Sequence, residues 1–156
     1  MRINVYTVNF GTAMTPDAAF SIANPLALAG WLALIAGIVL KHPLLRDVIA
    51  GRVIPVILSA AYATLILVFW WSAKGGFGAL SDVQTLFTQP WIALAGWVHY
   101  LAFDLAIGAW LARQVMERGL NRLFLVPILP LTFLFGPIGY LAAQGLLTLT
   151  TRESRP

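Results

Sequence analysis

Residues 91–112 read WIALAGWVHYLAFDLAIGAWLA, an apolar stretch that contains one acidic residue, Asp104, and neither lysine nor arginine. A helix crosses the hydrocarbon core of a bilayer in about 20 residues, and this stretch has that length. Inside hydrocarbon every backbone N–H and C=O must find its partner within the segment, which a helix achieves. The stretch therefore predicts a transmembrane helix.

Three further apolar runs of similar length flank it. Together the four runs cover residues 20–40, 53–71, 91–112 and 123–149. The pattern predicts an all-α integral membrane protein, a four-helix transmembrane bundle, with residues 1–156 forming a single membrane domain. The alternative is the core of a soluble bundle, but none of the runs shows the polar stripe of a surface helix.

Composition supports the membrane interpretation. The 156 residues are 60% hydrophobic and only 10% charged, whereas about 25% is usual for soluble domains. The net charge of +4 comes from basic residues scattered between the runs, so the chain lacks the basic stripe of a nucleic-acid-binding protein. Without cysteine there is no disulfide, iron–sulfur cluster or thiolate metal site. The expected surroundings are a lipid bilayer.

Basic residues predict an orientation. Four spans would place both termini on one side of the membrane. Loops 41–52 and 113–122 hold six of the lysines and arginines, and the opposite side holds four. The positive-inside tendency then favours these two loops as cytoplasmic. No cleavable signal precedes the first run.

Caps and prolines predict where helices begin and bend. Thr15-Pro16 is an N-cap followed by a first-turn proline, Asn121 can cap the fourth helix, and residues 81–84 (SDVQ) fit a capping box for a short interfacial helix. Pro25 and Pro137 each remove a backbone donor, so bends are expected at both.

Asp104 and His99 are the candidate catalytic residues. A carboxylate near the bilayer centre costs about 2.5–3.5 kcal/mol on insertion scales, so it serves a partner, a cavity or a reaction. A carboxyl group away from water holds its proton and can deliver it. The alternatives are an interhelical hydrogen bond for Asp104 and a core position for His99. A metal site would need more ligands than these.

Helical geometry divides the candidates between two faces. At about 100° per residue, Asp104 shares a stripe with Trp97, Tyr100 and Gly108, and His99 points about 140° away, near Phe103 and Gly96. Two such faces suit a central helix. We nevertheless expect Asp104, Tyr100, His99 and Asn24 to line or border one cavity that opens toward lipid. The deep aromatics Trp31, Trp97 and Phe103 are candidate contacts for a long apolar ligand, or simply fill the interior.

Two motifs resemble a known family. The stretch 96–105, GWVHYLAFDL, is similar to the Trp-x-His-x-x-x-x-Asp-Leu pattern of the neoxanthin-synthase-like membrane proteins, the family of the plant abscisic-acid-deficient plastid protein. The segment 113–119 continues the match. The stretch 131–139, LTFLFGPIG, is similar to the family's Leu-Phe-x-Pro-x-Gly pattern. With a weaker match at 20–41, the resemblance extends from about residue 20 to about residue 149.

The resemblance implies a role with carotenoids. Plant members are needed to convert an epoxy-xanthophyll into the allenic isomer neoxanthin. It carries His99 and Asp104 over as polar site residues and Trp97 and Pro137 as framework, whereas Tyr100 rests on helical geometry alone. The chain has no plant transit sequence, so it looks like a prokaryotic relative, and the location that this implies is the bacterial plasma membrane.

Three functions fit these features. The first is an isomerase of a carotenoid or related isoprenoid, with Asp104 as general acid/base, His99 as the second proton-handling group and no cofactor. The second is an accessory protein that binds the pigment or a lipid without catalysis. The third is a structural membrane subunit. A homo-oligomer is compatible with all three.

Overall fold

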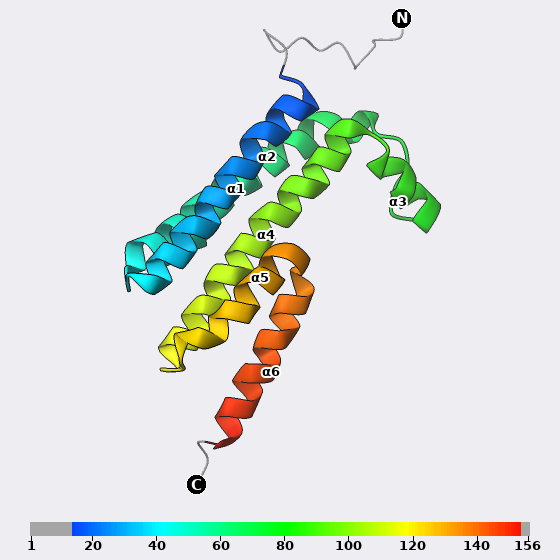
Figure 1. Ribbon diagram of the computed structural model, residues 1–156. Helices are drawn as coiled ribbons and strands as arrows, with labels where there is room; N and C mark the ends of the chain where they lie inside the picture. The colour runs from blue at the N-terminus through cyan, green and yellow to red at the C-terminus, as the bar shows by residue number, and fades with distance from the viewer. Residues whose placement is uncertain (1–13, 154–156) are drawn as a thin grey trace, which may run out of the picture.

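The computed structural model describes residues 14–153, and its regular structure is helical throughout that range (Figure 1). The α-helices are α1 (Pro16–Val39), α2 (Ile54–Phe69), α3 (Leu80–Phe87), α4 (Pro90–Glu117), α5 (Leu125–Phe135) and α6 (Pro137–Glu153). A π-helical segment, η2 (Leu44–Val53), precedes α2, and two short 3₁₀ segments, η3 (Trp70–Ser72) and η4 (Arg122–Phe124), follow α2 and precede α5. The all-α prediction is confirmed.

Three of the described helices are long and apolar enough to cross a membrane. They are Pro16–Val39, the continuous run Leu44–Ser72 that joins η2, α2 and η3, and Pro90–Glu117. These correspond to the first three predicted spans. Much of the predicted loop 41–52 is thus helical, and α4 continues into the predicted loop 113–122. The short interfacial helix expected before α4 is α3.

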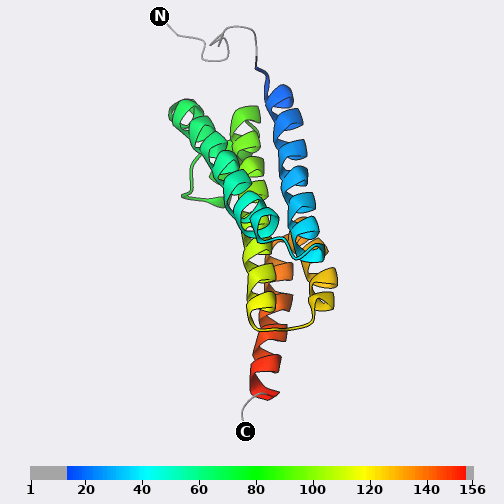
Figure 2. The same ribbon diagram turned by 90° about the vertical axis from the view of Figure 1, so that its left-hand side faces the viewer.

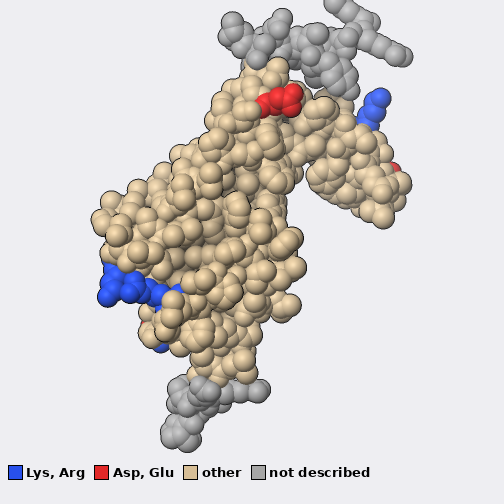
Figure 3. All heavy atoms as spheres, viewed as in Figure 1, with Lys and Arg blue, Asp and Glu red and all other residues tan. Residues whose placement is uncertain are grey.

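Helix α4 occupies the centre of the fold. It packs against α1, α2, α3, α5 and α6, and its side chains Val98, Leu105 and Leu111 are almost fully buried. Large apolar side chains on the other helices instead face outward, Leu32, Leu67 and Leu141 among them. The visible surface between the two ends of the molecule is nearly free of charge (Figure 3). This distribution is what a lipid environment requires.

The prediction of a fourth continuous span over residues 123–149 is wrong. The chain breaks at Gly136, whose φ is +26°, and α6 returns alongside α5 as an antiparallel hairpin (Figures 1 and 2). Pro137 has no backbone N–H to continue the α5 ladder, so the expected bend becomes a reversal. The described fold is three long helices plus this hairpin, and the four-helix bundle is not confirmed. By contrast, α1 continues through Pro25.

The hairpin also changes the predicted sidedness. The start of α1 and the end of α6 lie at opposite ends of the molecule (Figure 1), so the expectation of termini on one side is wrong. The end of α6 therefore lies at the same end of the molecule as the end of α1 and the start of η4. Basic side chains gather at that end in Figure 3, and Lys74 belongs to the other. Arg2 and Arg155 lie outside the described residues, and the cytoplasmic location stays a prediction.

A packed ion cluster fixes the basic end of the three long helices. Segment η2 lies close against α1. A Cβ added at Gly37 would lie 2.6 Å from the backbone nitrogen of Arg46. Asp47 pairs with Arg46 at 2.6 Å and with Arg113 of α4 at 3.3 Å. The cluster thus connects η2 to α4, and the open grooves of the fold are lined by other residues.

Two of the three predicted caps are confirmed. The Ala18 N–H donates to Thr15 Oγ1 at 3.1 Å, and the Leu123 N–H donates to Asn121 Oδ1 at 2.9 Å, where η4 begins. The capping box over residues 81–84 is wrong, because Ser81 already lies inside α3, which starts at Leu80. The N-cap is Ala79, which makes no side-chain hydrogen bond.

Candidate functional site

Helix α4 presents its polar residues on two opposite faces. Tyr100 donates to the carbonyl of Phe133, at the end of α5, and Asp104 contacts Gly136 at the break between α5 and α6. On the other side, His99 contacts Tyr62 of α2, and Gly96 packs under Phe87 of α3. The division predicted from helical periodicity is confirmed.

The first face borders a hollow that we call the Tyr100 groove. It measures about 460 Å³ and is lined by Asn24, Pro25, Ala27, Leu28, Trp97, Tyr100, Leu101, Phe133 and Leu134. Its walls come from α1, α4 and the end of α5. Several of its lining side chains are exposed, including Leu28 at 50% and Leu134 at 57%. The groove is therefore open along the apolar outer surface of the helices.

Two hydrogen bonds connect the helices around this groove. Trp97 Nε1 donates to Asn24 Oδ1 at 2.7 Å, and the Tyr100 hydroxyl donates to the Phe133 carbonyl at 3.0 Å. The residue four positions after Phe133 is Pro137, which lacks the N–H that a continuous helix would offer that carbonyl. The tyrosine therefore satisfies an acceptor that the proline leaves without a backbone donor.

Asp104 lies one helical turn beyond Tyr100. Its side chain is buried, at 6% exposure, and among the described residues its Oδ2 has no hydrogen-bond partner. A Cβ on Gly136 would collide with the carboxyl group. Glycine is thus required there for two reasons, the positive φ and the space that the carboxyl group occupies. Gly136 immediately precedes the start of α6, where helix N–H groups favour a negative charge.

Trp31 and Pro137 support the site without lining the groove. Trp31 is buried, at 4% exposure, and a Cβ on Gly108 would lie 2.6 Å from its ring. Its ring also meets Phe133 edge-on, with centroids 5.4 Å apart. Trp31 therefore fills the interior beneath the groove. Pro137 contributes because it lacks the N–H that would bond the Phe133 carbonyl, so that this carbonyl accepts from Tyr100.

The second face borders a separate hollow, the His99 groove. It measures about 430 Å³ and is lined by Tyr62, Ile66, Trp70, Phe77, Leu86, Phe87, Ile92, Gly96 and His99. The His99 ring lies 4.7 Å from that of Phe103 and 5.2 Å from that of Tyr62. The expectation that His99 lines one cavity with Asn24 and Tyr100 is wrong, because His99 lines a separate groove on another face of α4. No cluster of three potential metal ligands occurs within residues 14–153.

Sequence reasoning missed Gly136 and the Phe133 carbonyl. The Gly136-Pro137 dipeptide is a strong turn signal, and Pro137 identifies the carbonyl four residues earlier as one without its usual donor. Both signals stand in the printed sequence. Tyr62 lies in the second predicted span, and nothing in the sequence pairs it with His99.

Comparison with known proteins gives one family. The family model described as ABA4-like, ABA DEFICIENT 4-like, matches residues 18–142. Those residues include α1 to α5 and the first turns of α6, and hence the whole Tyr100 groove and Asp104. Neither a curated protein nor a solved structure matches the chain.

Proposed function

This chain belongs to the ABA4-like family, and on that premise we propose that it is a membrane-embedded isomerase of a carotenoid or related isoprenoid, which binds in the Tyr100 groove. The family is associated with carotenoid- and xanthophyll-related function. A bilayer-dissolved polyene would enter the groove from the side, where its walls face lipid. The aromatic side chains of Trp97 and Phe133 offer flat apolar contact to such a molecule.

The observation that carries the proposal is the buried carboxyl group of Asp104 beside that groove. Its Oδ2 is without a hydrogen-bond partner in the described part of the chain. A group of this kind inside a membrane segment is expensive and marks a functional position. Tyr100, four residues earlier on the same face of α4, lines the groove.

Conversion of an epoxide into an allene is a net isomerisation, so it requires only that one proton is delivered and another is removed. Tyr100 passes its proton to the epoxide oxygen as the carbon–oxygen bond opens, and Asp104 replenishes Tyr100. The proton lost from the neighbouring carbon returns through Tyr100 to Asp104 as the cumulated double bond forms. The product is an isomer of the substrate, and both side chains end in their starting states. Tyr100 thereby takes the part first given to His99, which faces the other groove.

A second candidate is a carotenoid-binding protein without catalysis. Asp104 fits against Gly136 and does not itself line the groove. On this account its carboxyl group positions the α5–α6 hairpin, and Asn24, Trp97 and Tyr100 hold the pigment.

The two candidates differ in the expected effect of Asp104→Asn. If Asp104 stores the proton, turnover of an epoxy-xanthophyll by purified protein in nanodiscs should fall about 10²–10⁴-fold, the usual share of general acid–base catalysis. Pigment retention and thermal stability should persist, because the amide keeps the shape of the carboxyl group. Asp104→Leu, which removes both polar atoms, provides the packing comparison. Full turnover in Asp104→Asn would exclude the catalytic role and leave binding.

A further inference from the structure

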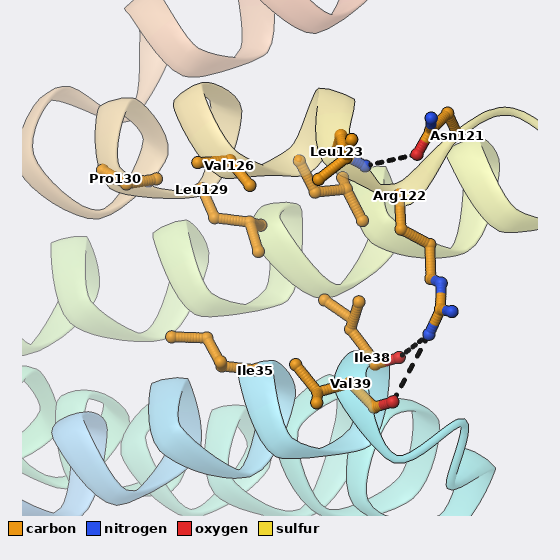
Figure 4. Close-up of a pocket in the computed structure, with 10 residues that line it drawn as sticks. Ile35, Ile38, Val39, Asn121, Arg122, Leu123, Val126, Leu129 and Pro130 are labelled. Atoms are coloured by element: carbon orange, nitrogen blue, oxygen red, sulfur yellow. Dashed lines mark hydrogen bonds between the residues drawn. The ribbon is translucent and has the colours of Figure 1, made fainter.

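A third hollow, the Arg122 groove, lies between α1 and the segment formed by η4 and α5 (Figure 4). It measures about 490 Å³. In Figure 4, Ile35 of α1 faces Val126, Leu129 and Pro130 of α5 across the open space, and Arg122 spans one end. It shares no lining residue with the Tyr100 groove, so a role for it does not depend on the proposed isomerase.

The long walls of this groove are apolar and open to lipid. Ile35 is 47% exposed and Val39 66% exposed on the α1 side, and Val126 is 66% exposed on the α5 side. These walls run along the helices, away from Arg122. Such a trough accepts an extended hydrocarbon chain that lies parallel to the helices.

The end of the groove that Arg122 spans, its mouth, is cationic. Arg122 Nη1 donates to the Ile38 carbonyl at 2.9 Å and to the Val39 carbonyl at 3.4 Å. Both carbonyls belong to the last turn of α1, where intrahelical partners run out. These bonds hold the guanidinium group at the mouth of the trough. A guanidinium has five N–H donors, and those on Nε and Nη2 have no partner among the described residues.

The surroundings reinforce this positive charge. Lys41 follows Leu40, the C-cap of α1, and Arg118 is the C-cap of α4 at the same end of the molecule. Figure 3 shows basic side chains gathered there. A groove with apolar walls and unpaired guanidinium N–H groups at its mouth is complementary to a molecule with a hydrocarbon tail and an anionic head.

We propose that the Arg122 groove binds an anionic phospholipid, with one acyl chain between α1 and α5 and the phosphate on the free N–H groups of Arg122. Arginine donors suit phosphate oxygens, and each basic residue near an anionic lipid surface contributes about 1 kcal/mol. The bound lipid would join the end of α1 to η4 beyond what the Arg122 bonds to Ile38 and Val39 provide.

Native mass spectrometry of the detergent-purified full chain tests the site. Phosphatidylglycerol and phosphatidylcholine with identical acyl chains are titrated against the protein. Phosphatidylglycerol should bind at least about fivefold more tightly, the ratio that corresponds to one basic contact. Arg122→Gln should remove this preference, and Val126→Trp should weaken binding of both lipids by filling the trough.

Matched variants separate the groove from general surface effects. Arg52→Gln removes an exposed charge at the same end that does not line the groove, and Leu67→Trp adds a ring on the exposed side of α2. Both should bind phosphatidylglycerol as the unmodified chain does. Val126→Trp leaves the Arg122 bonds intact, so it remains informative if Arg122→Gln unfolds. Equal binding of the two lipids, unchanged binding in Val126→Trp, or equal losses in Arg122→Gln and Arg52→Gln would overturn the proposal.

Discussion

The two faces of α4 use their polar residues differently. Toward α1 and the hairpin, Trp97 and Tyr100 donate hydrogen bonds to Asn24 and Phe133. Toward α2 and α3, His99 instead makes ring contacts with Tyr62 and Phe103. Both faces carry a groove of similar size. They therefore differ in chemistry and not in available space.

The difference follows from the backbone opposite each face. The backbone at Phe133–Pro137 is irregular, and inside a membrane irregular backbone must be satisfied by neighbouring groups or border a cavity. Tyr100 satisfies one carbonyl there, and Asp104 occupies the space that Gly136 leaves. Opposite His99, α2 is regular and offers ring faces. The two polar residues of this face, Tyr100 and Asp104, therefore lie where the helix is broken.

The largest effect on stability is expected where the two faces differ in backbone. Gly136→Ala introduces a side chain at a positive φ and against the Asp104 carboxyl group. Left-handed strain and overpacking together should lower the free energy of unfolding by about 2–5 kcal/mol.

Gly96→Ala is the matched change on the His99 face. Its Cβ would meet only the ring of Phe87, which is 55% exposed and can move, and alanine favours the helix. Its stability should stay within about 1 kcal/mol of the unmodified chain. Thermal unfolding in one detergent compares the two variants. Equal losses would show that the two faces do not differ in this way.

A smaller effect is expected from removing one hydroxyl on each face. Tyr100→Phe leaves the Phe133 carbonyl without its donor, which should cost about 1–3 kcal/mol of stability and reduce turnover through loss of the proton path. The Tyr62 hydroxyl makes no hydrogen bond within the described residues, so Tyr62→Phe should change stability by less than about 0.5 kcal/mol. Denaturant titration and turnover assays measure both. A Tyr62→Phe loss as large as that of Tyr100→Phe would remove the distinction.

Helix α4 shows how far the sequence could be taken. Its apolar length and a rotation of about 100° per residue were sufficient to predict a central helix with Asp104 and His99 on separate faces. Sequence could not indicate which helix meets each face, because α1 and the run Leu44–Ser72 that contains α2 are similarly apolar and both long enough to cross a membrane. The prediction of a single cavity was wrong for that reason, although the helical angle had already placed Asp104 and His99 on different faces of α4.

The fourth apolar run shows what hydropathy leaves open. Length and composition are the same for one spanning helix and for a hairpin of two shorter ones, so residues 123–149 were predicted as a span. Pro137 predicted a bend, but the reversal depends on α6 packing back along α5 and α4. That packing is a tertiary interaction between separate helices, which hydropathy along the sequence does not predict. Likewise, the bond from Tyr100 to Phe133 joins segments that the sequence does not bring together.

Photo-crosslinking of the pigment tests most directly whether the Tyr100 face holds the substrate. Benzoylphenylalanine is placed at Leu134, which lines the Tyr100 groove, or at Ile66, which lines the His99 groove. Each protein is reconstituted with an epoxy-xanthophyll and irradiated, and covalent pigment is measured by mass spectrometry. We expect a pigment adduct at position 134 and none above background at position 66. An adduct at position 66 alone, or equal adducts at both positions, would contradict the account.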